Sequence, residues 1–389
     1  MRRFIDFWNS LLRSPNSGNY IPFIDGFRFL AIAPVIFQHA NERLLKYSAS
    51  ASNQSGWEQM LSFLISRGTI GVFIFFAISG FVLTMPYAKG NRTLNYKTYI
   101  SRRLTRIEPP FVFWISLFAL ILLIQSNLGF GKVLAHYFAT LTYTHSIIYG
   151  EYSIINPVAW SLEVEIQFYL IAPFIALLYF NQKDGFVRRS FLIIFLIAYI
   201  TFQYVLGWNL HPLKATLLGH LQHFLIGMLA ADLYVNRKTI GRIKPWVWDA
   251  LAPVLLLVMA FTWTEEYYKT LIFNTALMLL LMAGFNGHYF NKFLSVKWIT
   301  IIGGMCYTIY LIHLPLLELL FSVIGSFGYS SPYWLQLSIS LIIAIPIVLF
   351  SSMIFFKTIE KPFMKPAGFK NLLGSIKGIV SENAVQIQK

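Results

Sequence analysis

Two side chains capable of polar chemistry, Arg28 and His39, occur in one apolar stretch near the N-terminus. Eleven helical steps of about 100° return to within roughly 20° of the starting direction and advance about 16 Å, so both side chains follow one stripe of a helix. An imidazole exchanges protons near neutral pH, and a guanidinium is a fixed cation. The pair indicates either an acid–base site with a cationic partner, or a structural arginine and a histidine that caps the helix end.

A second polar group lies in the segment 160–169, which reads WSLEVEIQFY and contains two carboxylates. A carboxylate in a cavity can hold an imidazole in one tautomer or exchange a proton, and we assign that role to Glu165 rather than Glu163. The alternative for either residue is a buried hydrogen-bond anchor between helices. Helical spacing puts Ser161, Glu165, Phe168 and Tyr169 on one face and Trp160, Glu163 and Gln167 on another.

Three arginines, Arg102, Arg103 and Arg106, precede another apolar run at i, i+3 and i+4 spacing. Guanidinium groups bind phosphates through paired hydrogen bonds, so this cluster is a candidate clamp for a donor that carries a diphosphate, such as coenzyme A. Anchoring to lipid head groups explains the same residues equally well.

Further candidates support rather than carry chemistry. Tyr310 and His313 are i, i+3 neighbours, and Pro315 is expected to bend their helix. Gly71 and Gly80 are expected to let helices approach closely. His220 and His223 are another polar pair, but they lack the glutamate and the third ligand of a zinc site. Cys306 is the single cysteine, so an intrachain disulfide is excluded. We therefore predict no metal site.

The elements that hold these residues are membrane helices. Of the 389 residues, 57% are hydrophobic and 12% are charged, and the mean hydropathy is +0.60. Lipid-facing helices exclude charge because each Lys, Arg or Asp at the bilayer centre costs roughly 2.5 to 3.5 kcal/mol. The composition predicts an all-α, polytopic integral-membrane bundle of about ten transmembrane helices. We place these near 24–41, 69–86, 109–125, 158–180, 190–208, 214–235, 246–263, 269–286, 299–321 and 335–356.

The distribution of positive charge orients the bundle. With the N-terminus in the cytoplasm, 24 of the 31 lysine and arginine residues fall in cytoplasmic segments and six in outer ones, while Arg28 lies within the first span. Both termini are then cytoplasmic, His39 and Glu165 lie toward the outer side, and the arginine cluster lies inside. The net charge of +15 thus reflects topology, and nucleic-acid binding is excluded for lack of a basic recognition motif.

The segment 132–148 leaves two possibilities open, a re-entrant or surface helix and an eleventh span that would invert everything after it. The N-terminus lacks the apolar region of a cleaved signal peptide. We expect one membrane domain over residues 1–370 and a cytoplasmic amphipathic or disordered tail over 371–389.

Six motifs occur in the order in which they occur in the acyltransferase-3 family of integral-membrane acyltransferases, and from residue 20 to about 366 the chain resembles that family. The motifs are IPFIDGFR ending at Arg28, with Arg-x10-His to His39; the Gly-Phe-rich 71–81; Arg103-x-x-Arg106 before Pro109; Trp160-Ser161-Leu162 with Val164-Glu165-x-x-Phe168-Tyr169; Tyr307-x-x-Tyr310-Leu-x-His313-x-Pro315; and Glu360-Lys361-Pro362. The chain departs from the family pattern at Glu163, Ile166 and Cys306.

The resemblance implies transfer of an acyl group, most commonly acetyl, from cytoplasmic acyl-CoA to a sugar hydroxyl of a surface polysaccharide, lipopolysaccharide or related envelope glycan. The glycan would be free or lipid-linked, and the protein would lie in the bacterial inner membrane. It further implies His39 as base or acyl carrier, Glu165 and Arg28 as its catalytic partners, and Arg102, Arg103 and Arg106 as the acetyl-CoA site. Trp160, Ser161, Tyr169, Tyr310 and His313 would support the site.

Some relatives carry an additional extracytoplasmic hydrolase-like domain, which we do not expect here. A transporter or flippase of lipid-linked glycans is the alternative from another class, because intramembrane charge and aromatic cavities suit it as well. The apparent lack of inverted repeats counts against that alternative.

Overall fold

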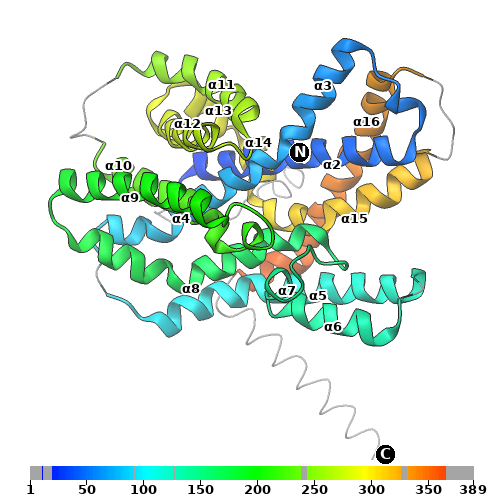
Figure 1. The fold of residues 1–389 in the computed structure, drawn as a ribbon, viewed down its shortest axis with the longest axis horizontal. Coiled ribbons are helices and arrows are strands. Elements are labelled where there is room, and N and C mark those ends of the chain that lie inside the picture. Colours follow the sequence, from blue (N-terminus) through cyan, green and yellow to red (C-terminus); the bar gives the residue numbers. More distant parts are fainter. Residues whose placement is uncertain are drawn as a thin grey trace, which may run out of the picture.

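A computed structural model describes residues 11, 20–91, 93–126, 128–237, 243–325 and 331–364, which form helices and contain no β-strand (Figure 1). The predicted tail 371–389 lies outside the described residues. The longer helices are α2 (Pro22–Tyr47), α3 (Gly56–Ser66), α4 (Ile70–Ala88), α5 (Tyr96–Gln125), α6 (Phe130–Leu141), α8 (Trp160–Asn181), α9 (Gly185–Leu206), α10 (Leu217–Val235), α11 (Pro245–Thr262), α12 (Tyr267–Asn286), α14 (Lys297–Gly304), α15 (Cys306–Gly325) and α16 (Tyr333–Phe355). Shorter elements are α7 (His145–Tyr149), α13 (Tyr289–Leu294), α17 (Lys361–Phe363), and the single turns η1 (Ser50–Ser52), η2 (Arg67–Thr69), η3 (Pro157–Ala159), η4 (Leu213–Ala215) and η5 (Phe356–Glu360).

The predicted all-α membrane bundle is confirmed. Within the described part of the chain, eight helical segments are long and apolar enough to cross a bilayer. They are Gly56–Ala88, Tyr96–Gln125, Pro157–Asn181, Gly185–Val205, Pro245–Thr262, Tyr267–Asn286, Cys306–Ile324 and Tyr333–Phe363. The other two predicted spans form α2 and α10, which have 26 and 19 residues.

These two helices contain the polar residues that lower their hydropathy, and both lie inside the bundle. Helix α2 packs against α4, α14, α15 and α16, and α10 packs against α4, α8, α9 and α12. Protein rather than lipid therefore surrounds residues such as Asp25 and His220, each of which is at least 95% buried. Figure 1 shows α11 paired with α12 on one side of this centre and α5 paired with α6 on another.

Helix α4 is the centre of the packing, because glycines bring its backbone against both neighbours. A Cβ at Gly71 would lie 1.9 Å from the carbonyl oxygen of Ala31 in α2, and a Cβ at Gly227 in α10 would lie 1.9 Å from that of Ala77 in α4. The predicted role of the small residues in α4 is thus confirmed, since only glycine permits these approaches.

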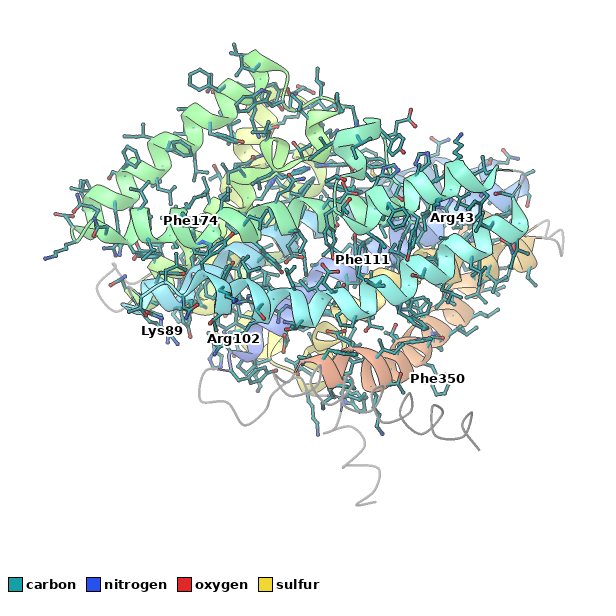
Figure 2. All side chains as sticks on the ribbon, turned by 90° about the horizontal axis from the view of Figure 1, so that it is seen from below. Arg43, Lys89, Arg102, Phe111, Phe174 and Phe350 are labelled. Atoms are coloured by element: carbon teal, nitrogen blue, oxygen red, sulfur yellow. The ribbon has the colours of Figure 1, made fainter. Side chains whose placement is uncertain are left out.

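Ion pairs and exposed apolar residues complete the bundle. Asp232 of α10 accepts hydrogen bonds from Tyr179 of α8 and from Arg188 and Arg189 of α9, at 2.6 to 2.9 Å for the closest atoms of each. This buried carboxylate ties three helices together at one end. The outer helices present apolar side chains to their surroundings, such as Phe350, which projects from the edge of the bundle in Figure 2 and is 63% exposed.

The ambiguous segment 132–148 forms two short helices rather than one span. Helix α6 has 12 residues and would extend only about 18 Å, less than the bilayer core of about 30 Å. A turn then leads to α7, whose His145 lies with Nε2 2.7 Å from Nδ1 of His136 in α6. This segment is therefore not an eleventh span, and the helices after residue 148 keep the orientation predicted for ten spans.

The packing of α4 against α10 predicts the effect of one added methyl group. Gly227→Ala places a Cβ against backbone atoms of Ala77 and Phe81, which cannot move like a side chain, so we expect a loss of about 1 to 3 kcal/mol or more. The readout is the thermal unfolding of the purified protein. Gly131→Ala is the matched control, because a Cβ there has nothing within 4 Å. Equal unfolding temperatures for the two variants would contradict the close approach of α4 and α10.

Candidate active site

His39 lies near the end of α2 with a carboxylate on one side and a second imidazole on the other. Its Nδ1 is 2.9 Å from Oε2 of Glu42, one turn later on the same helix, and its ring centroid is 5.3 Å from that of His313 on α15. A carboxylate that accepts the Nδ1 proton leaves Nε2 with the lone pair. His39 is thereby held in the tautomer suited to accept a proton.

His313 is held by its own helix. Its Nδ1 is 3.0 Å and 2.8 Å from the carbonyl oxygens of Ile309 and Tyr310, so Nδ1 carries the proton and Nε2 carries the lone pair. The side chain is fully buried, and its Nε2 has no hydrogen bond within the described part of the chain. Pro315 cannot donate to the carbonyl of Leu311, which instead faces Nδ2 of Asn156 at 3.4 Å.

Helices α15 and α8 are joined next to this pair. The hydroxyl of Tyr310 donates to the carbonyl of Val158, and Oγ of Ser161 lies 3.1 Å from the same hydroxyl. Trp160 points in another direction, with its ring centroid 5.3 Å from that of His220 in α10. The two faces of α8 that the sequence distinguishes therefore contact different helices, α15 on one face and α10 on the other.

Glu165 lies on the face with Ser161 and is nearly inaccessible, with 4% of its surface exposed. Its Oε1 accepts hydrogen bonds from Ser79 of α4 and, at 2.6 Å, from Tyr169 one turn along α8. Glu163 faces elsewhere and accepts a hydrogen bond from the backbone N–H of Ser146 at 3.0 Å, which anchors α7. The two carboxylates therefore have different neighbours, and the assignment of the acid–base role to Glu165 stays a prediction.

Three predicted arginines and Glu165 converge on one cavity, which has about 610 Å³ of empty volume. Arg28 enters it from α2, where it also pairs with Asp25, and Arg103 and Arg106 enter from α5. Arg102 is exposed and does not line this cavity. Figure 2 places Arg102, together with Lys89, near one end of the bundle and Arg43 of α2 near the opposite end. We call the cavity that Arg28, Arg103 and Arg106 line the arginine cavity.

A narrow apolar slot continues the arginine cavity toward the two histidines. It has about 460 Å³ of empty volume, and the residues common to both spaces are Phe75, Glu165, Cys306 and Tyr307. At its other end the slot is lined by Val35, Ser161 and Tyr310. Val35 is one helical turn before His39, and Tyr310 is one turn before His313. The slot thus extends from the arginine cavity to within one helical turn of each of the two histidines.

Two functional candidates were missed in the sequence. Glu42 carries the contact to His39, and its i, i+3 spacing on α2 was the available signal. Glu360, fully buried in η5, lies 3.6 Å from Nη2 of Arg106 through Oε1 and accepts a hydrogen bond from Thr308 at 2.7 Å. Glu360 belonged to a recognised motif, but its contact with an arginine some 250 residues away has no local signal.

The described residues contain no group of three or more histidine, cysteine, aspartate or glutamate side chains placed to hold a metal ion. What the site offers is an oriented imidazole, a cationic cavity and an apolar connection between them. This arrangement suits proton transfer at one end and the binding of an anionic group at the other.

Comparisons with known proteins agree with this chemistry. Residues 21–354 match the acyltransferase-3 family, described as an acyltransferase domain. The chain is 25% identical over 384 residues to the O-acetyltransferase OatA of Staphylococcus aureus (strain NCTC 8325 / PS 47), which covers 91% of this chain and 58% of that protein. It is 25% identical over 337 residues to the peptidoglycan O-acetyltransferase OatA of Listeria monocytogenes, covering 78% of this chain and 50% of that protein. The chain thus spans little more than half the length of these relatives. No solved structure matches it.

Proposed function

Because this chain belongs to the acyltransferase-3 family, we propose that it is a membrane-bound O-acyltransferase that transfers an acyl group from acyl-CoA to a sugar hydroxyl of an envelope glycan. The observation that carries the proposal is the arginine cavity joined to an apolar slot that extends to within one helical turn of His39. A donor bound at one end of this path can present its thioester near the imidazole at the other end. The names of the relatives support acetyl as the acyl group and a bacterial envelope glycan as the acceptor.

The arginine cavity suits the phosphates of coenzyme A. Arg28, Arg103 and Arg106 come from two helices, so their guanidinium groups surround a ligand rather than lying in one row. Guanidinium forks form charge-assisted, paired hydrogen bonds with phosphate oxygens. The excess of positive residues on the same side supports a cytoplasmic position for this end, where acyl-CoA is made. The protein would then lie in the cytoplasmic membrane of the bacterium.

The apolar slot suits the uncharged arm of the donor. Phe75, Tyr307 and Cys306 line it between the arginines and the histidines, so a thioester inside it is shielded from water. Glu165 lies where the slot meets the cavity, bonded to Ser79 and Tyr169. At that position Glu165 can position the donor, while Glu42 is the carboxylate that orients His39.

His39 performs the proton transfer in this proposal. Its Nε2 removes the proton from the sugar hydroxyl as the hydroxyl oxygen attacks the thioester carbonyl carbon. The C–S bond then breaks, and the proton passes from His39 to the leaving sulfur, so the products are the sugar ester and free coenzyme A. Glu42 holds the Nδ1 proton throughout and stabilises the imidazolium. His313, with its Nε2 lone pair beside His39, supports the acceptor end of the path.

Removing the imidazole tests this assignment. We expect His39→Ala to reduce acceptor-dependent release of coenzyme A from acetyl-CoA by about 10² to 10⁴, because that is the usual contribution of a general base. Binding of coenzyme A should stay unchanged, since His39 lies at the far end of the slot. His288→Ala, a substitution at an exposed histidine between α12 and α13, is the matched control. Undiminished release by His39→Ala at equal protein level would exclude His39.

A second prediction concerns binding in the arginine cavity. It compares Arg103, which lines the cavity, with its neighbour Arg102, which does not. Arg103→Gln should weaken binding of coenzyme A by about tenfold or more, because it removes charge-assisted hydrogen bonds. Arg102→Gln removes the same charge one residue away from an exposed position outside the cavity, and we expect little change. Titration calorimetry measures both. Equal weakening by the two substitutions would indicate a diffuse electrostatic effect and contradict binding in the cavity.

A further inference from the structure

A second and larger cavity lies at the His39 end of the bundle, and no step of the proposed reaction uses it. It has about 860 Å³ of empty volume and opens among the ends of α4, α9, α10, α11 and α12. We call it the lateral cavity. Its principal side chains are Phe73, Gln203, His220, Gln222, His223, Trp263, Phe273 and Asn274, with Arg67, Lys214 and Glu265 among the charged residues. We propose that it binds the sugar chain of the acceptor, as a segment of linked N-acetylhexosamines, and this inference rests on the function proposed above.

Buried polar side chains line this cavity. His220, His223 and Asn274 are at least 95% buried. Oδ1 of Asn274 has no hydrogen-bond partner among the described residues, and the rings of His220 and His223 have only weak contacts with the backbone of Lys214 and of His220. Buried polar groups that stay unpaired cost free energy, so native proteins keep them where a ligand or water completes them. The three residues give the cavity a wall rich in side chains that can form hydrogen bonds.

The chemistry of these atoms favours a neutral ligand. A neutral imidazole has one donor and one acceptor, and the Asn274 oxygen only accepts, so the wall both donates and accepts hydrogen bonds. Hydroxyl and acetamide groups do the same, whereas an anion only accepts. The charged residues are already engaged: Lys214 pairs with Glu265 at 2.6 Å, and Nη1 of Arg67 donates to the carbonyl of Trp263 at 3.2 Å.

Aromatic side chains supply the remaining wall. The ring of Phe73 stacks on that of His223 with centroids 4.7 Å apart and lies 6.5 Å from that of Trp263. Flat rings beside a few convergent polar groups are typical of pockets for small organic ligands, and the apolar C–H faces of sugar rings pack on such surfaces.

Hydrogen bonds connect the lateral cavity to the reaction site. Arg67 belongs to η2, whose Thr69 donates to Oε1 of Gln38 through its backbone N–H at 2.5 Å and its hydroxyl at 2.7 Å. Gln38 in turn donates to Oε1 of Glu42 at 2.8 Å, and Glu42 holds His39. A sugar chain bound in the lateral cavity would therefore be linked to the imidazole through η2, Gln38 and Glu42.

Binding of a soluble sugar chain tests the inference directly. The probe is the β-1,4-linked tetramer of N-acetylglucosamine, titrated calorimetrically into the full chain in lipid nanodiscs, because maltoside detergents carry sugar head groups. We expect His220→Phe, which keeps a ring among its aromatic neighbours, and Asn274→Leu each to weaken tetramer binding by about tenfold. His288→Phe, the same substitution at an exposed position at the other end of the bundle, should bind as the wild type does.

The outcomes separate this inference from the proposed function. Retained binding of coenzyme A shows that the variants are folded. His220→Phe and Asn274→Leu test the contribution of the cavity to tetramer binding independently of each other. Failure of the wild type to bind the tetramer, or equal binding by wild type and both cavity variants, would overturn the inference. If binding depends on the cavity but the wild type releases no coenzyme A from acetyl-CoA with the tetramer, the proposed function fails and the binding site stands. If sugar acylation proceeds with the same KM in wild type and His220→Phe, the function stands and the lateral cavity is not its sugar site.

Discussion

Charge within a bilayer must be paired or hydrogen-bonded, and the interior of this protein is organised around that requirement. Asp232 satisfies it with Arg188 and Arg189, and this contact only joins helices. Two residues of the arginine cavity satisfy it differently: Arg106 lies beside the buried Glu360, and Glu165 accepts hydrogen bonds from two hydroxyls. A structural ion pair thus differs from a candidate binding site in that the charged groups of the site line a common cavity.

The fold was predictable because its signal is local and strong. Each of the ten predicted apolar runs is helical, although the run 299–321 is divided between α14 and α15, and the small residues of α4 predicted its close contacts with neighbouring helices. The segment 132–148 was ambiguous because hydropathy cannot detect the turn that divides it into α6 and α7. The stripe from Arg28 to His39 was correctly placed on one helix, since helical geometry alone determines it.

The site was less predictable because tertiary contacts decide it. Spacing grouped Arg102 with Arg103 and Arg106, but the packing of α5 leaves Arg102 exposed. The sequence named Glu165 as the partner of the imidazole, whereas the carboxylate bonded to His39 is Glu42. His220 was considered only as a metal ligand; its place in the lateral cavity depends on the ends of five helices meeting, which no local pattern records.

The central claim is that one path joins a donor at the arginine end to an acceptor at the His39 end. Proteoliposomes with the protein in one orientation test it most directly, with labelled acetyl-CoA supplied only at the arginine face and the N-acetylglucosamine tetramer only at the opposite face. The account predicts labelled sugar in the tetramer compartment and free coenzyme A in the donor compartment. Labelled sugar formed only when both substrates share one compartment would contradict it.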